Sequence, residues 1–424
     1  MTDKLKGLGA AWLIYLRAMA KWLGVALVTG ALCGLIGTAF HVGVERVTEL
    51  RAARGWLLYM LPLFGLAIVA LYKLLGAEGL STNNILEEVH SGRGVSIKLL
   101  PAIFAATLLT HLGGGSVGRE GAALQMGGAV GYQAGRLLRL DDSDMRVTTT
   151  VGMAAFFSAL FGTPMAATVF AMGITNVGRV YYAELLPCLA AALTAYGVSV
   201  FLGVQPTAFT VAAPSLTVGM LLRVALLAAL CAFVSVLFCE TIHFAEKTMA
   251  RWLPDPWLRA AAGGAIVAAL TLLLGTTDYN GAGMPVIARA VEQGSAAPAA
   301  FALKLVFTAV TLAAGFKGGE VVPSFFVGAT FGCVVGPLFG VPAGFAAAVG
   351  LVAVFCGAVN CPLASTFLAL ELFGADGMLY FALACALSFV LSGYSGIYSS
   401  QRILYDKLKA QYINVQTNAH RAGR

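Results

Sequence analysis

Gly118-Arg119-Glu120-Gly121 lies between two long apolar runs, and a related string, Gly318-Gly319-Glu320, follows later in the chain. Each string places a carboxylate where a helix is expected to begin inside an apolar region. An ionisable side chain inside a bilayer costs roughly 2.5–3.5 kcal/mol or more, so such a residue is a functional candidate by default. Two of them in related positions indicate a membrane protein that handles ions near its centre.

The composition supports a membrane protein. Hydrophobic residues make up 59% of the 424 residues and charged residues only 11%, whereas soluble domains contain about 25% charged residues. Apolar stretches of helix length recur from residue 11 to residue 392, and the alternating pattern of outer-membrane strands is missing. The sequence therefore predicts an all-α polytopic membrane protein.

Glycine and proline interrupt this hydrophobic pattern. The chain has 50 glycines and 14 prolines, and many apolar runs end before the roughly 20 residues of a full span. Broken backbone at membrane depth is tolerated only where protein buries it or where it lines a polar cavity. The pattern favours a transporter or channel over a receptor or a purely structural protein, which would not need broken helices with buried carboxylates.

Cysteines, histidines and net charge indicate neither a cofactor nor nucleic-acid binding. The eight cysteines form no CxxC pair and are interpreted as small buried side chains, and the five histidines are scattered, so no metal site is expected. The net charge is +7, but the basic residues gather at the expected membrane boundaries and are not a nucleic-acid signal.

The distribution of charge predicts the orientation in the lipid bilayer. Residues 201–222 carry no charge, whereas both ends of the chain are basic. The positive-inside rule therefore predicts cytoplasmic termini and places the loop near 202–215 outside. The basic residues at the two ends are Lys4, Lys6, Arg17, Lys21, Arg402, Lys407, Lys409, Arg421 and Arg424.

The chain matches itself at a shift of about 200 residues. Gly118 and Glu120 fall on Gly318 and Glu320, and with a shift of 198 Pro164 falls on Pro362. With a shift of 202, residues 79–92 match residues 281–294 at several positions. Because these matches keep the same order, we expect two repeats.

We therefore expect a single transmembrane transport domain, residues 1–424, in which neither half folds alone. Repeat 1 covers about residues 20–205, repeat 2 about residues 216–400, and a short cytoplasmic tail follows at 402–424. Such repeats build a site at their interface from broken helices whose N-termini point at an anion. The sequence alone leaves open whether the repeats are inverted.

Three Gly-rich breaks precede helical runs, and each carries a polar candidate. In the first, Ser81 or Thr82 can cap the following helix, or can offer a hydroxyl to a desolvated anion. In the second, Glu120 can occupy the place of an anion at a helix N-terminus and can leave it on protonation. Alternatively, Glu120 caps its helix and pairs with Arg119.

Two further residues have both a functional and a structural interpretation. Glu320 is in a position similar to that of Glu120, but Lys317 is near enough in sequence for a structural ion pair. Tyr398 lies where the last apolar segment gives way to the basic tail. Its phenol could donate to an anion, although tyrosine at such a boundary is commonly an interfacial belt residue.

These motifs make the chain similar to the CLC family of chloride channels and transporters over nearly its whole length. Gly118-Arg119-Glu120-Gly121 matches the family's G-R-E-G-P motif, with Ala122 in place of proline. Gly318-Gly319-Glu320-Val321-Val322-Pro323 matches its G-G-x-F-x-P motif, with Val321 in place of phenylalanine.

Three more positions carry the same resemblance. Pro164 and Pro362 match the paired prolines that follow the two motifs, and Tyr398 falls on the family's central tyrosine. The resemblance implies an inverted repeat of tilted and broken helices, and a homodimer with a separate anion pathway in each subunit. The resemblance also implies that Glu120 is the external gate that carries the proton.

The same resemblance implies which residues bind the anion. Backbone amides near Val321 and Val322 line the pathway together with the side chains of Ser81 and Tyr398. The full set of expected anion-binding residues is Ser81, Gly118, Arg119, Gly121, Gly319, Glu320, Val321, Val322 and Tyr398.

Departures from the family pattern bear on the subtype. The family's G-S-G-I-P motif is altered around Ser81, so its register is open by a residue or two. Ile174 stands where proton-coupled chloride members carry an inner glutamate. Glu320 resembles the fluoride-exporting branch, which also lacks that glutamate, although this branch often has threonine where Val322 stands.

We therefore expect a CLC-type protein that moves chloride or a related halide across a bacterial-type inner membrane, gated by a protonatable glutamate. Fluoride/proton antiport is the alternative, and a passive channel also remains open. The expected partners are halide anions and protons. No cofactor and no enzymatic activity are expected.

One alternative comes from another class of protein. Gly393-Tyr394-Ser395-Gly396 matches the GxSG pattern of intramembrane serine proteases. Such an enzyme needs a histidine base on a later membrane helix. The only histidine after Ser395 is His420, in the polar tail, which argues against a protease.

Overall fold

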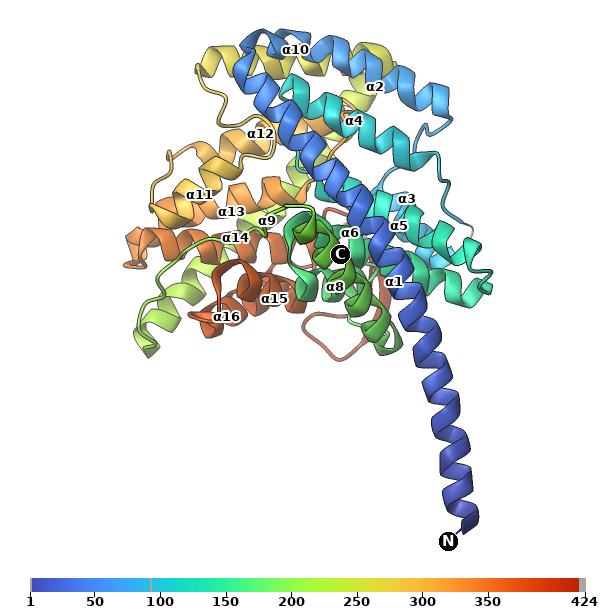
Figure 1. Ribbon diagram of the computed structural model, residues 1–424. Coiled ribbons are helices and arrows are strands. Elements are labelled where there is room, and N and C mark those ends of the chain that lie inside the picture. Colours follow the sequence, from blue (N-terminus) through green and yellow to red (C-terminus); the bar gives the residue numbers. More distant parts are fainter. Residues whose placement is uncertain (1, 92–93, 419–424) are drawn as a thin grey trace.

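The computed structural model describes residues 2–91 and 94–418, without the side chains of residues 2–11, 88, 90 and 91. His420, Arg421 and Arg424, which entered the predictions above, lie outside this description, as do the side chains of Lys4 and Lys6. Within the described part the chain forms 16 α-helices and three short strands (Figure 1).

The α-helices are α1 (Thr2–Ala53), α2 (Leu61–Leu75), α3 (Thr82–Ser91), α4 (Leu99–Gly113), α5 (Glu120–Leu137), α6 (Asp142–Phe161), α7 (Pro164–Gly173), α8 (Leu185–Phe201), α9 (Val218–Trp252), α10 (Pro256–Leu274), α11 (Met284–Glu292), α12 (Ala300–Ala313), α13 (Val321–Val335), α14 (Ala343–Val359), α15 (Pro362–Phe373) and α16 (Met378–Leu391). Short 3-10 helices are η1 (Gly55–Met60), η2 (Tyr182–Glu184) and η3 (Gly336–Phe339), and the strands are β1 (Asn176–Val177), β2 (Arg402–Tyr405) and β3 (Tyr412–Gln416).

Long apolar helices and shorter ones alternate along the chain. In the part that the structure describes, six helical segments are long and apolar enough to cross a membrane, namely Trp12–Ala53, Gly55–Leu75, Tyr182–Phe201, Val218–Trp252, Pro256–Leu274 and Val321–Phe339. Other apolar helices, such as α7 and α15, are too short for a full span. This mixture agrees with the expected broken helices and confirms an all-α membrane protein.

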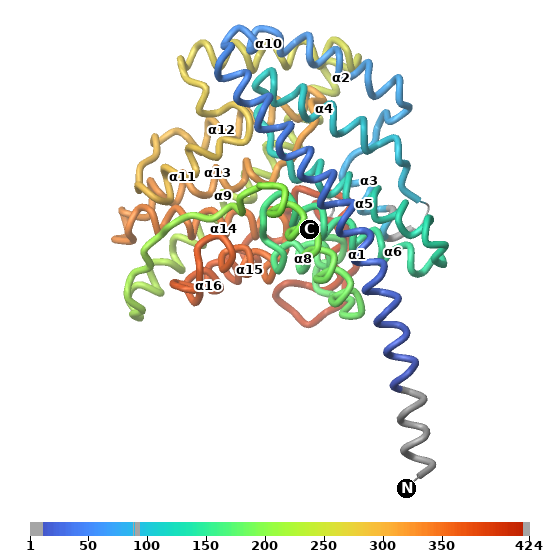
Figure 2. The backbone as a smooth tube through the Cα atoms, in the orientation of Figure 1, coloured from blue at the N-terminus to red at the C-terminus, as the bar shows by residue number. Residues whose placement is uncertain are grey.

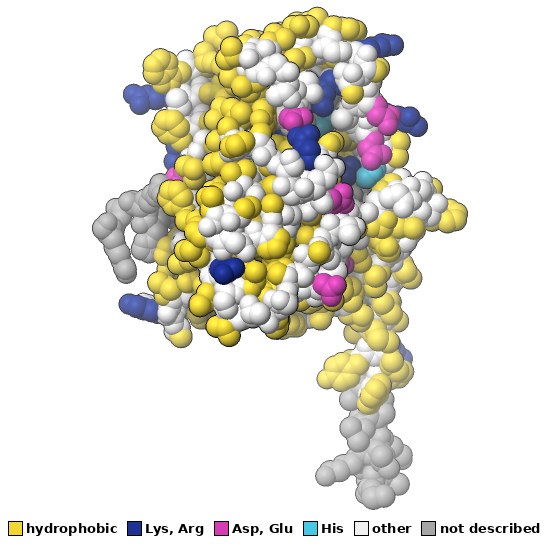
Figure 3. Space-filling view, turned by 90° about the vertical axis from the view of Figure 1, so that its left-hand side faces the viewer, with side chains coloured by type: hydrophobic (Ala, Val, Ile, Leu, Met, Phe, Trp, Pro, Cys, Tyr) yellow, Lys and Arg dark blue, Asp and Glu magenta, His cyan; other side chains and the backbone are white. Residues whose placement is uncertain are grey.

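The surface is apolar to an extent that suits lipid. Large hydrophobic side chains stay exposed on α1, α8 and α9, among them Trp12, Phe201 and Phe233. Figure 3 shows hydrophobic side chains over much of one face of the molecule. Exposed apolar areas of this kind mark a membrane or protein contact.

The order of elements is similar in the two halves of the chain. The series from α3 to α8 and the series from α11 to α16 each begin with a short helix, and α7 and α15 each begin at a proline, Pro164 and Pro362. This similarity agrees with the predicted repeats, whose boundaries stay a prediction.

The halves also share a closely packed helix pair, α5 on α6 and α13 on α14. Glycines permit the approach: a Cβ on Gly152 would collide with the carbonyl oxygen of Gly127, and one on Gly350 would collide with that of Gly328. Small residues at crossings let helix backbones pack closely in membranes. All eight cysteines are buried as well, which agrees with their interpretation as small core side chains.

The C-terminal segment is not a free tail, because residues 402–416 fold back onto the first half. β2 pairs parallel with β1 and antiparallel with β3, and Figure 2 shows the red C-terminal segment returning to the body. The buried side chains of Ile403 and Leu404 explain this return. The Tyr394 hydroxyl and nearby backbone N–H groups hold the pKa of Asp406, in the hairpin turn, below its usual range.

We expect Gly152→Ala to destabilise the protein by about 1–3 kcal/mol, because the new Cβ forces α5 and α6 apart. The measurement is the thermal midpoint in detergent. Gly24→Ala is the matched control, since a Cβ there meets no atom within 4 Å, and we expect it to be neutral or slightly stabilising. Equal midpoints for the two variants would contradict the proposed close crossing.

Candidate functional site

Two Gly-rich loops meet at the centre of the molecule. The N–H of Gly118 donates to the carbonyl oxygen of Gly319 at 2.6 Å, and the N–H of Gly319 donates to that of Gly118 at 2.8 Å. We call this pair of hydrogen bonds the Gly118–Gly319 bridge. Because α5 begins at Glu120 and α13 at Val321, the bridge brings two helix N-termini together. A Cβ on Gly121 would lie 2.9 Å from the Gly318 carbonyl oxygen, which explains why this position is glycine.

Side chains from the second half hold the first loop in place. Asn280 Nδ2 donates to the carbonyl oxygen of Gly114 at 2.7 Å, and the N–H of Gly281 donates to that of Gly115 at 3.0 Å. The backbone N–H of Ser116 donates to Thr311 Oγ1 at 3.1 Å. The loop before α5 therefore depends on residues far away in sequence.

The side chain of Glu120 is completely buried and reaches across to the other loop. Its Oε2 accepts from the N–H of Arg119 at 2.9 Å and from the N–H of Val322 at 3.3 Å. Because Val322 lies in the first turn of α13, the carboxylate occupies the place where a helix N-terminus would bind an anion. Within the described ranges no ion pair joins the Arg119 side chain to Glu120, so the structural pairing weighed above is not formed.

Glu320 sits immediately before α13, and its Oε2 is buried without a hydrogen-bond partner in the described part of the chain. Gly121 is close to it, since a Cβ there would lie 3.3 Å from that oxygen. Lys317 does not form the alternative ion pair among the described residues; its Nζ lies 4.5 Å from the centre of the Tyr72 ring. A buried carboxylate oxygen without a donor is costly, which suits a group that meets a ligand or a proton.

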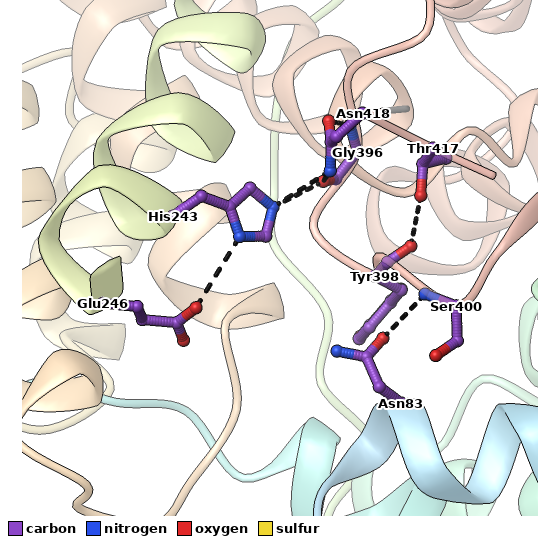
Figure 4. A network of polar contacts seen from close by, with 8 residues as sticks. All are labelled: Asn83, His243, Glu246, Gly396, Tyr398, Ser400, Thr417 and Asn418. Carbon is purple, nitrogen blue, oxygen red and sulfur yellow. Dashed lines mark hydrogen bonds and ion pairs between the residues drawn. The ribbon is translucent and has the colours of Figure 1, made fainter. Parts of the chain in front are cut away.

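A cavity of about 160 Å³ opens on one side of the bridge, and we call it the Tyr398 cavity. Tyr398 is buried, and its hydroxyl has no hydrogen-bond partner among the described residues. Its backbone carbonyl accepts from Thr417 Oγ1 at 2.5 Å (Figure 4). The ring is thus held by its backbone while its hydroxyl is free to donate. Predicted and unpredicted residues line this cavity, including Ser81, Thr82, Asn83, Gln125, His243, Glu246, Lys317, Gly318 and Glu320.

At the start of α3, Ser81 and Asn83 differ in the hydrogen bonds that their side chains form near Tyr398. Ser81 Oγ donates to Asn84 Oδ1 at 2.8 Å, so that hydroxyl is engaged locally. Asn83 Oδ1 accepts from the N–H of Ser400 at 3.1 Å, and Figure 4 draws this amide beside Tyr398. The sequence offered no signal for Asn83, because the motif that would have fixed the register is altered there.

The other side of the bridge opens to a larger cavity of about 450 Å³, which we call the Arg119 cavity. Basic and acidic side chains both line it, and Arg51 donates to the carbonyl oxygen of His111 at 3.2 Å. Val322 lines this cavity and Glu320 lines the Tyr398 cavity. Glu120 is thus hydrogen-bonded to Val322, which lines the Arg119 cavity.

The structure also shows the surroundings of Ile174 and of Ser395, two residues that entered the sequence analysis. Ile174 is completely buried, and its carbonyl oxygen accepts from Gln401 Nε2 at 2.9 Å. The Oγ of Ser395, in the GxSG string, donates to Glu240 Oε1 at 3.4 Å. His420, the base that a protease would need, lies outside the described residues.

Comparison with known proteins shows the family. Residues 64–393 match the voltage gated chloride channel family. The chain belongs to the CLC family. A chloride/fluoride channel protein of Pseudomonas syringae pv. tomato is 36% identical over 399 residues, covering 92% of this chain and 88% of the relative. An H(+)/Cl(-) exchange transporter ClcA of Vibrio cholerae is 26% identical, covering 93% of this chain and 91% of the relative.

A solved structure agrees with this placement. The crystal structure of a CLC-type fluoride/proton antiporter superposes with a TM-score of 0.86 at 30% identity, covering 90% of this chain and 98% of that one. The CLC protein described here is therefore an integral membrane anion transport protein with a CLC-type fold, as predicted. Members of the family are channels or antiporters, so the protease alternative is excluded.

We expect Tyr398→Phe to leave stability within about 0.5 kcal/mol of wild type, because the hydroxyl has no partner to lose. If that hydroxyl donates to the transported anion, the variant loses a hydrogen bond to a charged group, about 1.5–3 kcal/mol, or roughly 10- to 100-fold in apparent anion affinity. Initial efflux rates from liposomes over a range of anion concentrations measure this, with the thermal midpoint as control. An unchanged affinity would remove Tyr398 from the pathway.

Proposed function

We propose that this CLC protein exports fluoride in exchange for protons across a bacterial inner membrane, with both termini in the cytoplasm. The observation that carries the proposal is the carboxylate of Glu120 on the N-terminus of α13. An anion and a carboxylate compete for the same N–H groups there, and protonation removes the competitor. Anion movement and proton movement are coupled by this exchange.

Glu320 favours fluoride over chloride as the substrate. Its unpartnered oxygen lies at the same bridge as Glu120, so a protonated carboxyl there can donate to an anion. Fluoride, the halide of highest charge density, gains most from such a donor and pays the largest dehydration cost without one. The names of two similar proteins, a chloride/fluoride channel protein and a fluoride/proton antiporter, point the same way.

The other proposed site residues support this exchange. Gly118, Gly121 and Gly319 allow the two loops to approach, and Arg119 adds positive charge to its cavity. Backbone N–H groups of Val321 and Val322 form the anion end of α13. On the other side, Tyr398 and Asn83 offer donors, and Ser81 shapes the entrance. We also propose a homodimer, with one complete pathway in each subunit.

A direct test measures halide and proton flux together from liposomes loaded with fluoride or chloride. We expect fluoride efflux with opposing proton movement in the wild type. In Glu120→Gln, proton movement should fall by about 100-fold or more, since its carrier is gone. Glu78→Gln, in an exposed turn, removes the same charge elsewhere and should behave as wild type.

Other outcomes of this experiment decide against the proposal in distinct ways. Chloride efflux coupled to protons would leave exchange intact and replace the substrate. Fluoride efflux without proton movement in the wild type would make the protein a channel with Glu120 as a simple gate. No flux of either halide through a folded protein would refute anion transport.

The Tyr398 cavity also offers a proton route that does not need a carboxylate at position 174. His243 and Glu246, both on α9, line this cavity together with Glu320. His243 Nδ1 lies 3.7 Å from Glu246 Oε2, and its Nε2 contacts the Gly396 carbonyl oxygen at 3.0 Å and Asn418 at 3.2 Å (Figure 4). Lys317 is the remaining charged group of the cavity lining. We propose that this pair passes protons between the cytoplasm and Glu320.

We expect His243→Gln combined with Glu246→Gln to slow proton-coupled fluoride efflux roughly 10-fold or more, because neither amide titrates. Glutamine keeps a hydrogen-bonding group at both positions, which separates proton transfer from a structural role. The measurement is the pH dependence of the initial rate, which should flatten in the variant while the fluoride concentration at half-maximal rate stays unchanged. If the initial rate of the variant keeps the wild-type pH dependence, His243 and Glu246 are not part of the proton route.

A further inference from the structure

A third cavity, of about 360 Å³, lies among α6, the segment from β1 to η2, and the C-terminal hairpin. It shares no lining residue with the Arg119 cavity or the Tyr398 cavity. Its lining is largely polar and includes three arginines, Arg146, Arg179 and Arg402. We call it the arginine cavity. The halide exchange proposed above does not use it.

The three arginines come from separate elements, and their guanidinium groups have no partners among the described residues. Arg146 lies on α6, Arg179 follows β1, and Arg402 begins β2. In residues 2–91 and 94–418, no ion pair and no side-chain hydrogen bond engages any of these guanidinium groups. Among the described residues that line the cavity, Glu184 alone is acidic. The cavity thus carries an excess of positive charge that nothing in the described chain neutralises.

The chemistry of the lining selects an oxyanion over a halide. A guanidinium group presents a planar fork of N–H donors that matches two oxygens of a phosphate, and charge-assisted pairs of this kind are strong. A halide ion offers a single acceptor centre, so it does not match the two-point geometry of a guanidinium fork as two phosphate oxygens do. The hydroxyls of Tyr181 and Tyr412 add donors at the same cavity. A ligand with one or more phosphate groups uses all of these groups together.

The position of the cavity fits the edge of a bilayer. Tyr181 and Tyr412 are 57% and 60% exposed, and α8, one of the spans, begins just after Glu184. Tyrosine is enriched where membrane meets water, and basic pockets between helices on the cytoplasmic side bind phospholipid headgroups. The proposed cytoplasmic termini put the cavity on this side.

We propose that the arginine cavity binds a phosphate-bearing anion, either the headgroup of an anionic phospholipid or a soluble phosphate compound. Binding ties Arg402 of the hairpin to Arg146 of α6. The same hairpin holds the backbone of Tyr398 through Thr417, so an occupied cavity also steadies one wall of the anion pathway.

The test compares two double variants that remove equal charge. Arg146→Gln with Arg402→Gln removes two guanidinium groups from the cavity. Arg136→Gln with Arg139→Gln removes two exposed arginines at the C-terminal end of α5, one in its last turn and one just after it. Two probes are used on purified full-length protein: sodium pyrophosphate in detergent, at matched ionic strength, and phosphatidylcholine vesicles with and without cardiolipin. The readout is the rise in thermal midpoint with probe concentration.

For wild type and the Arg136/Arg139 variant we expect the same rise, and for the Arg146/Arg402 variant a response shifted about tenfold or more to higher probe concentration. If the response of the Arg146/Arg402 variant shifts with cardiolipin alone, the ligand is a lipid headgroup. If it shifts with pyrophosphate alone, the ligand is a soluble phosphate. No rise in the wild type, or an equal shift in both variants, overturns the proposal. The thermal midpoint reports ligand binding, so this test does not depend on whether the protein transports fluoride.

Discussion

The contact between the Glu120 carboxylate and the N–H of Val322 is the interaction on which the rest of the structure depends. It joins the start of α5 in the first half to the start of α13 in the second. The Gly118–Gly319 backbone bridge brings the two loops so close that the carboxylate of one reaches the helix N-terminus that follows the other. A side chain at Gly121 or Gly319 would push the loops apart, so the glycines belong to the site as much as the glutamate does.

This arrangement explains why neither half would be sufficient. The first half contributes a carboxylate without a complete binding site, and the second contributes helix N–H groups without the competing charge. The loop before α5 is itself held by Asn280 and Thr311. Separating the halves would therefore remove both the contact between Glu120 and α13 and the support that positions it. The helix pairs α5–α6 and α13–α14 pack closely in their turn, because glycines stand where each pair crosses.

The sequence predicted the fold class correctly and pointed to the two loops that meet at the Gly118–Gly319 bridge, because both depend on local signals. Hydrophobic runs reveal membrane helices, and a carboxylate after several glycines at a helix start is visible without any structure. Asn83 and His243 were not predicted, because their roles come from neighbours more than 150 residues away, Ser400 and Gly396. The sequence predicts only a short tail at 402–424, because strands of four and five residues beside charged residues give little periodicity.

That hairpin has a physical consequence for the pathway. Lys407 donates to Asn360 at 2.5 Å and to the carbonyl oxygen of Phe389 at 2.7 Å, which fixes the hairpin turn against α14 and α16. Asn418 and Thr417 then bond the backbone of Gly396 and Tyr398. The segment that carries Tyr398 is thus restrained from its main chain alone. A side chain positioned in this way can keep its hydroxyl unpaired inside the protein, because backbone bonds supply the restraint that a hydroxyl bond would otherwise give. An unpaired buried hydroxyl carries a desolvation cost, and the anion contact proposed for Tyr398 would offset that cost. On this proposal the hairpin would favour anion binding without contacting the anion.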